Sequence, residues 1–197
     1  YFFDLYEAVR PDEVVLVNGT LTKDMFTADE PAQVILKNST TGKETALAVS
    51  EQDGSFTAVV KKEEASELVL KVEAKNAAFN AAPLRLKLAS SGPPADVARI
   101  EVDLEHKELA QGEAYPIPHI LFETASDRLD AQSKVLIQEF AEYLAGARQL
   151  KVQIQGHTDN VGDPAANLDL SKRRAKRVAD LLYELGISSS RLSHQGY

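Results

Sequence analysis

Two patterns of apolar and polar residues divide this chain of 197 residues. In its first half, short apolar runs recur about every ten residues, and turn-forming residues separate them. Such spacing is typical of a small antiparallel sandwich, in which short strands alternate with turns rich in Gly, Asn and Asp. We therefore expect an all-β sandwich over residues 13–103, with strands at Val14–Val17, Ala32–Leu36, Thr45–Val49, Phe56–Val60, Leu68–Val72 and Val97–Val102.

Turns are predicted where Asn and Gly interrupt these runs, at Asn18-Gly19, Asn38–Gly42 and Asp53-Gly54. Two of the asparagines, Asn18 and Asn38, also begin Asn-x-Thr/Ser sequences of the kind that can carry glycans. Their position between apolar runs favours a role in the turns over a role as glycan sites.

From residue 119 the apolar residues follow a helical period instead. The expected elements are a strand at Ile120–Phe122, a helix over 129–147, a strand at 151–155, a helix over 163–185 and a strand after Ile187. Ser126 or Asp127 could cap the first helix, and Pro164 suits the first turn of the second. This order predicts an α+β sandwich, β-α-β-α-β, with both helices on one face of a small sheet.

The remaining residues divide the chain further. Residues 1–12 are expected to end a preceding element, because the chain begins on Tyr1 inside an aromatic, strand-like run. We therefore expect it to be part of a longer protein. Ser90–Pro94 is the clearest linker signal, since Pro and Gly disfavour both helix and strand. Residues 104–118 are a turn-rich connection to the second domain, 119–197.

Composition narrows the possible functions. Apolar residues make up 44% and charged residues 26%, as in an ordinary globular protein, and the net charge is −8. An acidic chain is poorly suited to nucleic acid, whose binding requires Lys and Arg to neutralise phosphates. The absence of cysteine excludes disulfides, thiolate metal sites and cysteine nucleophiles. No apolar run reaches the roughly 18–20 residues of a membrane span, so we expect no transmembrane segment.

One charged residue of the second predicted helix lies on its apolar side. At about 100° per residue, Ala175, Val178 and Leu182 gather in one sector, and Arg174 falls inside it. An inward charge needs a partner, because an unpaired buried charge costs several kcal/mol. Asp159, which follows the preceding strand, is one candidate, and the carboxylate of a ligand is the other. Asp159 and Arg174 would suit a zwitterionic ligand, but a structural salt bridge explains the pattern equally well.

Catalysis and the binding of nucleic acid or lipid are the alternatives to ligand binding at Asp159 and Arg174. His157 and Asp159 could suggest acid–base catalysis, but no nucleophile accompanies them, and the histidines have no metal-ligand spacing. We therefore expect no enzyme, no cofactor and no metal. The basic run Lys172–Arg177 could suggest nucleic acid or anionic lipid. Most of its charges map to the outward side of the helix, which favours an ordinary solvated surface.

The residues around Arg174 resemble a known family. The resemblance rests on Gly156-His157-Thr158-Asp159-Asn160-x-Gly162, Asn167, Leu170-Ser171-x-x-Arg174-Ala175-x-x-Val178, Leu182, Gly186-Ile187, Arg191-Leu192, Gly196-Tyr197 and, upstream, Phe122-Glu123-Thr124-x-Ser126. Over residues 119–197 this pattern resembles the OmpA-like peptidoglycan-binding domain. That module occurs in outer membrane protein A, in the peptidoglycan-associated lipoprotein and in flagellar stator proteins.

The resemblance implies non-covalent binding of the peptidoglycan stem peptide through its diaminopimelate residue. Asp159 and Arg174 match the family's Asp and Arg, which would hold the amino and carboxylate groups at the side-chain end of diaminopimelate. Asn167 matches the family's Asn, which is expected to order the loop. The positions that line the family's pocket are occupied here by Thr124, Thr158, Asn160, Val161 and Leu170.

The sequence departs from the family at one point. Family members usually continue past Gly196-Tyr197 with a loop, an Asn-Arg-Arg stretch and a final strand. We therefore expect the domain in this chain to lack its last strand and to expose a sheet edge.

The first domain is similar to the carboxypeptidase regulatory-like sandwich, through the segments Val17–Leu21, Ala32–Leu36 and Ser50–Phe56. The order of the two domains resembles envelope proteins of the Bacteroidetes type. In those proteins a β-propeller commonly precedes the sandwich, and residues 1–12 would be its end.

The expected function is attachment of the outer membrane, or of an outer-membrane complex, to the cell wall. The expected location is the periplasm, in association with the outer membrane, with peptidoglycan and outer-membrane proteins as partners. The alternative is a structural scaffold, in which both domains make protein contacts within an outer-membrane assembly.

Overall fold

The computed structural model describes residues 14–21, 32–73, 79, 81–83, 98–104, 110–117, 120–159 and 161–197. The chain divides into two compact units, residues 1–116 and residues 117–197, which are described separately below. The element expected at residues 1–12 and the linker signal at Ser90–Pro94 lie outside the described residues. None of the described helices combines the length and the apolar composition that a membrane span requires.

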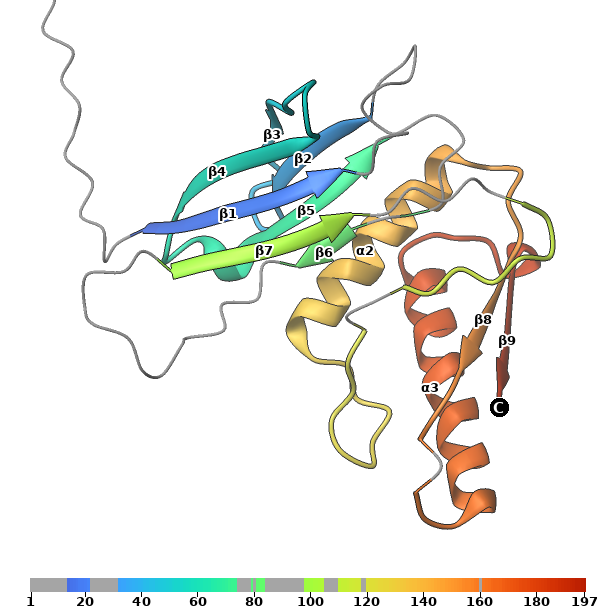
Figure 1. Ribbon diagram of the computed structural model, residues 1–197. Helices are drawn as coiled ribbons and strands as arrows, with labels where there is room; N and C mark the ends of the chain where they lie inside the picture. The colour runs from blue at the N-terminus through green and yellow to red at the C-terminus, as the bar shows by residue number, and fades with distance from the viewer. Residues whose placement is uncertain are drawn as a thin grey trace, which may run out of the picture. The chain divides into compact units, whose positions relative to one another are not determined.

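The described part of the N-terminal unit is β-rich and contains two sheets (Figure 1). One sheet has the order β4-β1-β7 and consists of Ser55–Lys61, Val14–Leu21 and Ala98–Leu104. The other has the order β3-β2-β5-β6 and consists of Glu44–Leu47, Gln33–Asn38, Leu68–Glu73 and Ala81–Pro83. A 3-10 turn, η2 (Ala65–Glu67), precedes β5. Each of the predicted strands overlaps an observed one, whereas β6 was not predicted.

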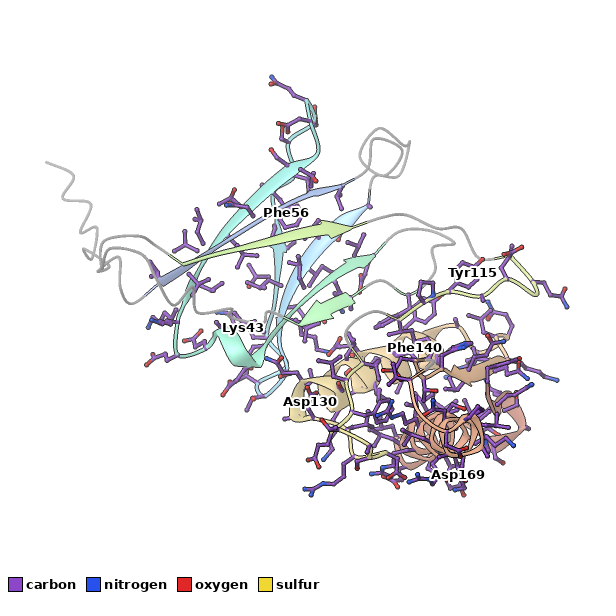
Figure 2. All side chains as sticks on the ribbon, turned by 60° about the horizontal axis from the view of Figure 1, so that its bottom comes forward. Lys43, Phe56, Tyr115, Asp130, Phe140 and Asp169 are labelled. Carbon is purple, nitrogen blue, oxygen red and sulfur yellow. The ribbon has the colours of Figure 1, made fainter. Side chains whose placement is uncertain are left out.

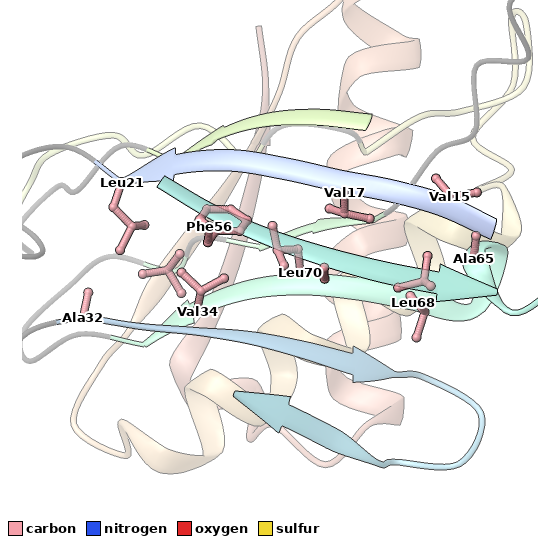
Figure 3. Packing of buried hydrophobic residues seen from close by; sticks show 12 residues of the cluster. Val15, Val17, Leu21, Ala32, Val34, Phe56, Ala65, Leu68 and Leu70 are labelled. Atoms are coloured by element: carbon pink, nitrogen blue, oxygen red, sulfur yellow. The ribbon is translucent and has the colours of Figure 1, made fainter. Parts of the chain in front are cut away.

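The core of this unit is built from both sheets. Along β4, buried and exposed residues alternate, as expected for a strand with one face covered. Phe56 of β4, Val17 of β1 and Leu70 of β5 belong to one buried cluster with Val34 of β2 (Figure 2 and Figure 3). Apolar side chains from the two sheets therefore meet in one cluster, whose burial is the main stabilising term for this unit.

The two predicted asparagine turns have different outcomes. At Asn38 the turn is confirmed, because the Asn38 Oδ1 accepts hydrogen bonds from the backbone N–H of Thr40 (3.0 Å) and Thr41 (2.8 Å). At Asn18 the prediction is wrong. Asn18 and Gly19 lie inside β1, where β4 pairs with them on one side and β7 on the other. Pairing with two distant strands overrides the local turn preference.

The C-terminal unit contains the helices α2 (Ala131–Gly146) and α3 (Pro164–Glu184) and the strands β8 (Val152–Gly156) and β9 (Leu192–Gly196). A 3-10 turn, η3 (Ser189–Arg191), precedes β9. The two strands pair in parallel, as a crossover through α3 requires (Figure 1). The predicted α/β character and the predicted helices are confirmed.

The strand predicted at Ile120–Phe122 is wrong, because only the isolated bridge between Phe122 and Leu129 forms there. The reason lies in Ser133 on α2. Its Oγ accepts from the N–H of Leu121 (2.7 Å) and donates to the C=O of Leu121 (3.1 Å), which takes the place of a neighbouring strand. The helix cap was also predicted wrongly. Asp130 caps α2, accepting from the Ser133 N–H at 2.6 Å (Figure 2).

Arg191, in the turn before β9, ties that strand to the end of α2. Its Nε donates to the C=O of Leu150 at 2.8 Å, and one Nη donates to the C=O of Leu144 and of Ala147, both at 2.9 Å. The last carbonyls of a helix lack partners within it and attract positive charge. Arg191 therefore fixes the end of α2 relative to the start of β9.

Two paired glycines bring α3 against the strands. Gly156 of β8 pairs with Gly196 of β9, and both face the helix at Ser171. A Cβ on Gly156 would lie 2.2 Å from the C=O oxygen of Ser171, and a Cβ on Gly196 would lie 2.4 Å from the Ser171 Oγ. Ser171 itself is fully buried. Only glycine permits this close approach at the two positions.

Substitution of Gly196 by Ala should therefore destabilise the C-terminal unit. The added methyl group would overlap the backbone of Lys172, and overpacking of this kind costs about 1–3 kcal/mol. Urea unfolding of the full chain, followed by helical circular dichroism, measures this loss. Gly146→Ala is the matched control, because nothing lies within 4 Å of its Cβ position at the end of α2. A Gly196→Ala protein as stable as this control would contradict the packing argument.

Candidate binding site

The residues predicted to bind ligand lie on α3 and on the loops at its two sides. Asp163 caps α3 by accepting from the Ala166 N–H at 2.8 Å, and Pro164 begins the helix, as predicted. Asn167 and Arg174 lie two helical turns apart on the same side of α3, about 10 Å along the axis. Each of them donates to backbone carbonyl groups of a different loop, and the two loops flank the candidate site.

Asn167 holds the loop between β8 and α3. Its Nδ2 donates to the C=O of Asp159 at 3.2 Å and to the C=O of Val161 at 2.9 Å. Both donor hydrogens of this amide are therefore used on one loop. This contact fixes the backbone of the loop while leaving the side chains of Asp159 and Val161 exposed, and that of Val161 is 73% exposed.

Arg174 holds the loop between Phe122 and Leu129. Its Nε donates to the C=O of Ser126 at 3.0 Å, and its Nη2 lies 3.5 Å from the C=O of Glu123. The guanidinium also lies over the ring of Phe122, with Cζ 5.0 Å from the ring centroid, a cation–π geometry. Arg174 is half-buried, so the prediction that it turns inward is supported.

The ion pair between Arg174 and Asp159, one of the two alternatives from the sequence, does not form within the described part of the chain. Backbone carbonyls and an aromatic ring take the place of the carboxylate. A guanidinium has about five N–H donors, and hydrogen bonds to described residues use only Nε and Nη2 of Arg174. The outer edge of the group, formed by Nη1 and the second hydrogen of Nη2, has no partner there.

The loop that accepts from Arg174 is closed on itself. Phe122 and Leu129 form an isolated bridge, and the Glu123 N–H donates to the C=O of Arg128 at 2.9 Å. Within it, the Ser126 N–H donates to the C=O of Glu123 at 3.1 Å. Ala125 has a φ of 53°, which is unusual for a residue with a side chain and stores strain of about 1–3 kcal/mol. Sequence reasoning did not identify this arrangement, because backbone carbonyls leave no residue-type signal.

The structure locates the remaining predicted residues as follows. Thr124 is exposed on the closed loop, Thr158 is half-buried after β8, and Leu170 is half-buried on α3. Asp159 is exposed, and its carboxylate makes no hydrogen bond or ion pair with any residue described in the structure. Asn160 lies outside the described residues.

His157 and Tyr197 form a stacked pair that the sequence analysis missed. Their ring centroids are 5.1 Å apart and their planes differ by 10°. The Tyr197 N–H donates to the C=O of Gly156 at 3.0 Å, which extends the β8–β9 pairing by one residue. The parallel register places the two rings side by side. Among the described residues, no cluster of His, Asp or Glu could hold a metal ion.

The basic run on α3 is largely neutralised by acids of the same helix. Arg173 pairs with Asp169 at 2.8 Å, Lys176 pairs with Asp180 at 2.6 Å, and Arg177 pairs with Glu184 at 3.4 Å. These pairs are exposed and contribute little stability each. They support the interpretation of this run as a solvated helix surface.

Residues 121–197 match the OmpA family. The chain is 36% identical to the outer-membrane lipoprotein YfiB of Pseudomonas aeruginosa over 77 residues, which is 39% of this chain and 46% of the lipoprotein. It is 29% identical to the peptidoglycan-associated lipoprotein of Mesorhizobium japonicum over 118 residues, 60% of this chain and 63% of that protein. The crystal structure of the peptidoglycan-associated lipoprotein from Burkholderia pseudomallei is 31% identical, with a TM-score of 0.38, over 39% of this chain and 65% of that one.

Within the C-terminal unit, residues 121–197 are therefore similar to the OmpA family, and a peptidoglycan-associated lipoprotein is among the proteins that the chain resembles. The matched part of the chain spans 46% of the length of the first lipoprotein and 63% of the second. Relatives of this domain are lipoproteins and porins, which are not enzymes, and the prediction of a non-enzymatic domain is confirmed on that ground.

The two loop contacts predict separable effects of mutation. Asn167→Ala should lower the NMR order parameters of the backbone at Asp159 and Val161, since two hydrogen bonds of about 0.5–1.5 kcal/mol each that hold their carbonyl groups are lost. It should leave the closed loop of residues 122–129 unchanged. Arg174→Ala should have the opposite pattern, with lower order parameters at Ser126 only. If either substitution loosened both loops equally, the two contacts would not be independent.

Proposed function

We propose that the C-terminal unit binds peptidoglycan without covalent bonds, through the side-chain end of a diaminopimelate residue. Asp159 receives the ammonium group, and Arg174 receives the carboxylate. The proposal rests on the opposite charges of Asp159 and Arg174. Hydrogen bonds to backbone carbonyls hold the loop that carries Asp159 and the side chain of Arg174. No described acidic or basic residue neutralises either charge. A zwitterion satisfies both charges at once.

Arg174 is suited to a carboxylate because part of its guanidinium is already immobilised. The contacts with Ser126 and Phe122 hold the plane of the group, so less side-chain entropy is lost when a ligand binds. The outer Nη1 and Nη2 edge presents two parallel N–H groups, the arrangement that a carboxylate accepts in bidentate fashion. The ring of Phe122 and the half-burial of the group lower the local dielectric and strengthen this contact.

Asp159 is suited to an ammonium group because its backbone is held in place while its carboxylate has no partner among the described residues. Asn167 holds the backbone oxygen of Asp159, and not its carboxylate. The side chain is exposed and makes no ion pair within the described residues, so its charge remains available to a ligand. An ammonium group bound there would form an ion pair with this carboxylate.

We propose that the other predicted residues line the same site. Thr124 and Thr158 offer hydroxyl groups from the two loops, and Val161 and Leu170 offer apolar contact to the methylene chain of diaminopimelate. Asn160, which lies outside the described residues, stands between Asp159 and Val161 in the sequence. Strained Ala125 has a supporting role, because its backbone turns the carbonyl of Ser126 toward Arg174.

The similarity to known proteins supports a function at peptidoglycan and the outer membrane. One relative is named as a peptidoglycan-associated lipoprotein, and others as outer-membrane proteins. We propose that this chain acts in the periplasm and attaches an outer-membrane protein or complex to the cell wall. For residues 13–103 we propose a carboxypeptidase regulatory-like sandwich that precedes the binding domain, as in envelope proteins of the Bacteroidetes type.

Co-sedimentation of the full chain with isolated sacculi tests the proposal. Wild-type protein should pellet with sacculi that contain diaminopimelate, and free diaminopimelate should compete. Asp159→Asn should abolish pelleting without loss of stability, because this carboxylate has no structural contact among the described residues. Arg174→Ala should abolish it as well, with some loosening of the closed loop.

Neighbouring charges provide matched controls. Arg173→Ala removes a cation next to Arg174 that is already paired with Asp169, and Asp169→Ala removes its partner. Both variants should still pellet with sacculi. Undiminished binding by Asp159→Asn and Arg174→Ala would overturn the assignment of the site. If wild-type protein did not pellet at all, a scaffold function through protein contacts would replace peptidoglycan binding.

A further inference from the structure

The strands β8 and β9 have a second face that the binding site does not use. Because Gly156 and Gly196 point at α3, residues of the opposite parity point away from the helix. This outer face consists of Gln153, Gln155, His157, Ser193, Gln195 and Tyr197, all of which are exposed. Parallel pairing aligns Gln153 with Ser193 and Gln155 with Gln195. The stacked rings of His157 and Tyr197 form a third row directly after the two strands.

The six residues of the outer face include no Asp, Glu, Lys or Arg, although these residue types make up 26% of the chain. The exposed Lys151, which precedes β8 and has the same parity, lies at the end of this face opposite His157. The glutamines of the outer face are linked to one another. The Gln155 Nε2 donates to the Gln153 Oε1 at 3.2 Å, and the Gln153 Nε2 donates to the Gln195 Oε1 at 3.5 Å. Each amide retains further donor and acceptor capacity, since a side-chain amide can make about four hydrogen bonds.

The rows of amides end at the stacked rings of His157 and Tyr197. Tyr197 remains 50% exposed in this arrangement. Because the two rings stack on each other, one face of each is covered, and the ring edges and the outer faces of the pair remain for contact with a ligand. Neutral amides in rows, followed by flat rings, match the chemistry of a sugar chain, which has hydroxyl and amide groups at its edges and C–H groups on its faces.

We propose that the outer face of β8 and β9 binds the N-acetylated amino sugars of a glycan strand. The glutamine amides bond to the acetamido and hydroxyl groups, and the His157–Tyr197 pair contacts the face of a sugar ring. The lack of cationic side chains on this face disfavours nucleic acid and anionic lipid, both of which require positive charge.

This proposal rests on the proposed peptidoglycan function and extends it to the glycan. His157 is followed directly by Thr158 and Asp159 of the candidate site. A stem peptide held at Asp159 needs only a few residues to reach the outer face, since an extended chain spans about 3.3–3.6 Å per residue. One peptidoglycan unit could therefore contact both surfaces.

Titration of the full chain with three soluble probes tests the inference. The probes are a tripeptide stem that ends in diaminopimelate, the same stem attached to its disaccharide, and a peptide-free N-acetylglucosamine tetrasaccharide. The disaccharide–peptide should bind about 3- to 10-fold more tightly than the tripeptide, a difference of about 0.7–1.4 kcal/mol. The tetrasaccharide alone should shift the NMR signals of Gln153, Gln155 and Gln195 but not those of α2.

The double variant Gln153→Ala, Gln155→Ala and the variant Tyr197→Ser should each bring the affinity ratio close to one. Neither should change the affinity for the tripeptide, which shows that the protein remains folded. Gln138→Ala, which removes an exposed glutamine on α2, is the matched control and should keep the full ratio.

The outcomes separate the two proposals. If the tripeptide binds but the sugars add no affinity and cause no shifts on the outer face, the glycan inference is overturned and the diaminopimelate site stands. If the tetrasaccharide shifts the outer face but the tripeptide does not bind, the glycan surface is supported and the diaminopimelate site is overturned. A ratio that the outer-face variants leave unchanged would place the sugar contacts elsewhere and overturn this inference.

Discussion

The contact between α3 and the glycine pair of β8 and β9 is the constraint on which the C-terminal unit depends. Because Gly156 and Gly196 have no Cβ, the backbone of α3 at Ser171 lies directly against both strands. That contact fixes the rotation of α3 about its axis, since only the turn with buried Ser171 and Ala175 fits there. The rotation in turn decides where Asn167 and Arg174 point. The two strands thereby position the side chains of Asn167 and Arg174, although the polar groups of these side chains bond to loops and not to the strands.

In the candidate site, the groups that hold the loops in place differ from the groups that are available to bind a ligand. Asn167 and Arg174 use side-chain donors on backbone carbonyls of two loops, and this leaves the Asp159 carboxylate and the outer edge of the Arg174 guanidinium without partners among the described residues. A direct ion pair between Asp159 and Arg174 would have neutralised both groups and competed with any charged ligand. Ala125, whose backbone is strained, directly precedes Ser126, whose carbonyl accepts from Arg174.

The sequence predicted most of the fold because its apolar residues repeat clearly. The helices at 129–147 and 163–185 differ from the observed α2 and α3 by no more than two residues at either end. Errors arose where a distant partner decides the local structure. The bond from Ser133 replaces the predicted strand at Leu121, and pairing with β4 and β7 keeps Asn18 extended. For the same reason the sequence identified Arg174 as unusual but could not identify its partners, which are backbone carbonyls that every residue has.

The central claim is that opposite charges at Asp159 and Arg174 recognise a zwitterionic side chain, and the most direct measurement compares two stem peptides that differ only there. One ends in diaminopimelate, and the other ends in lysine, which has the ammonium group but lacks the carboxylate. Calorimetric titration of the full chain should give at least about tenfold weaker binding for the lysine peptide, corresponding to about 1.4 kcal/mol for the missing contact with Arg174. Equal affinities for the two peptides would contradict the account.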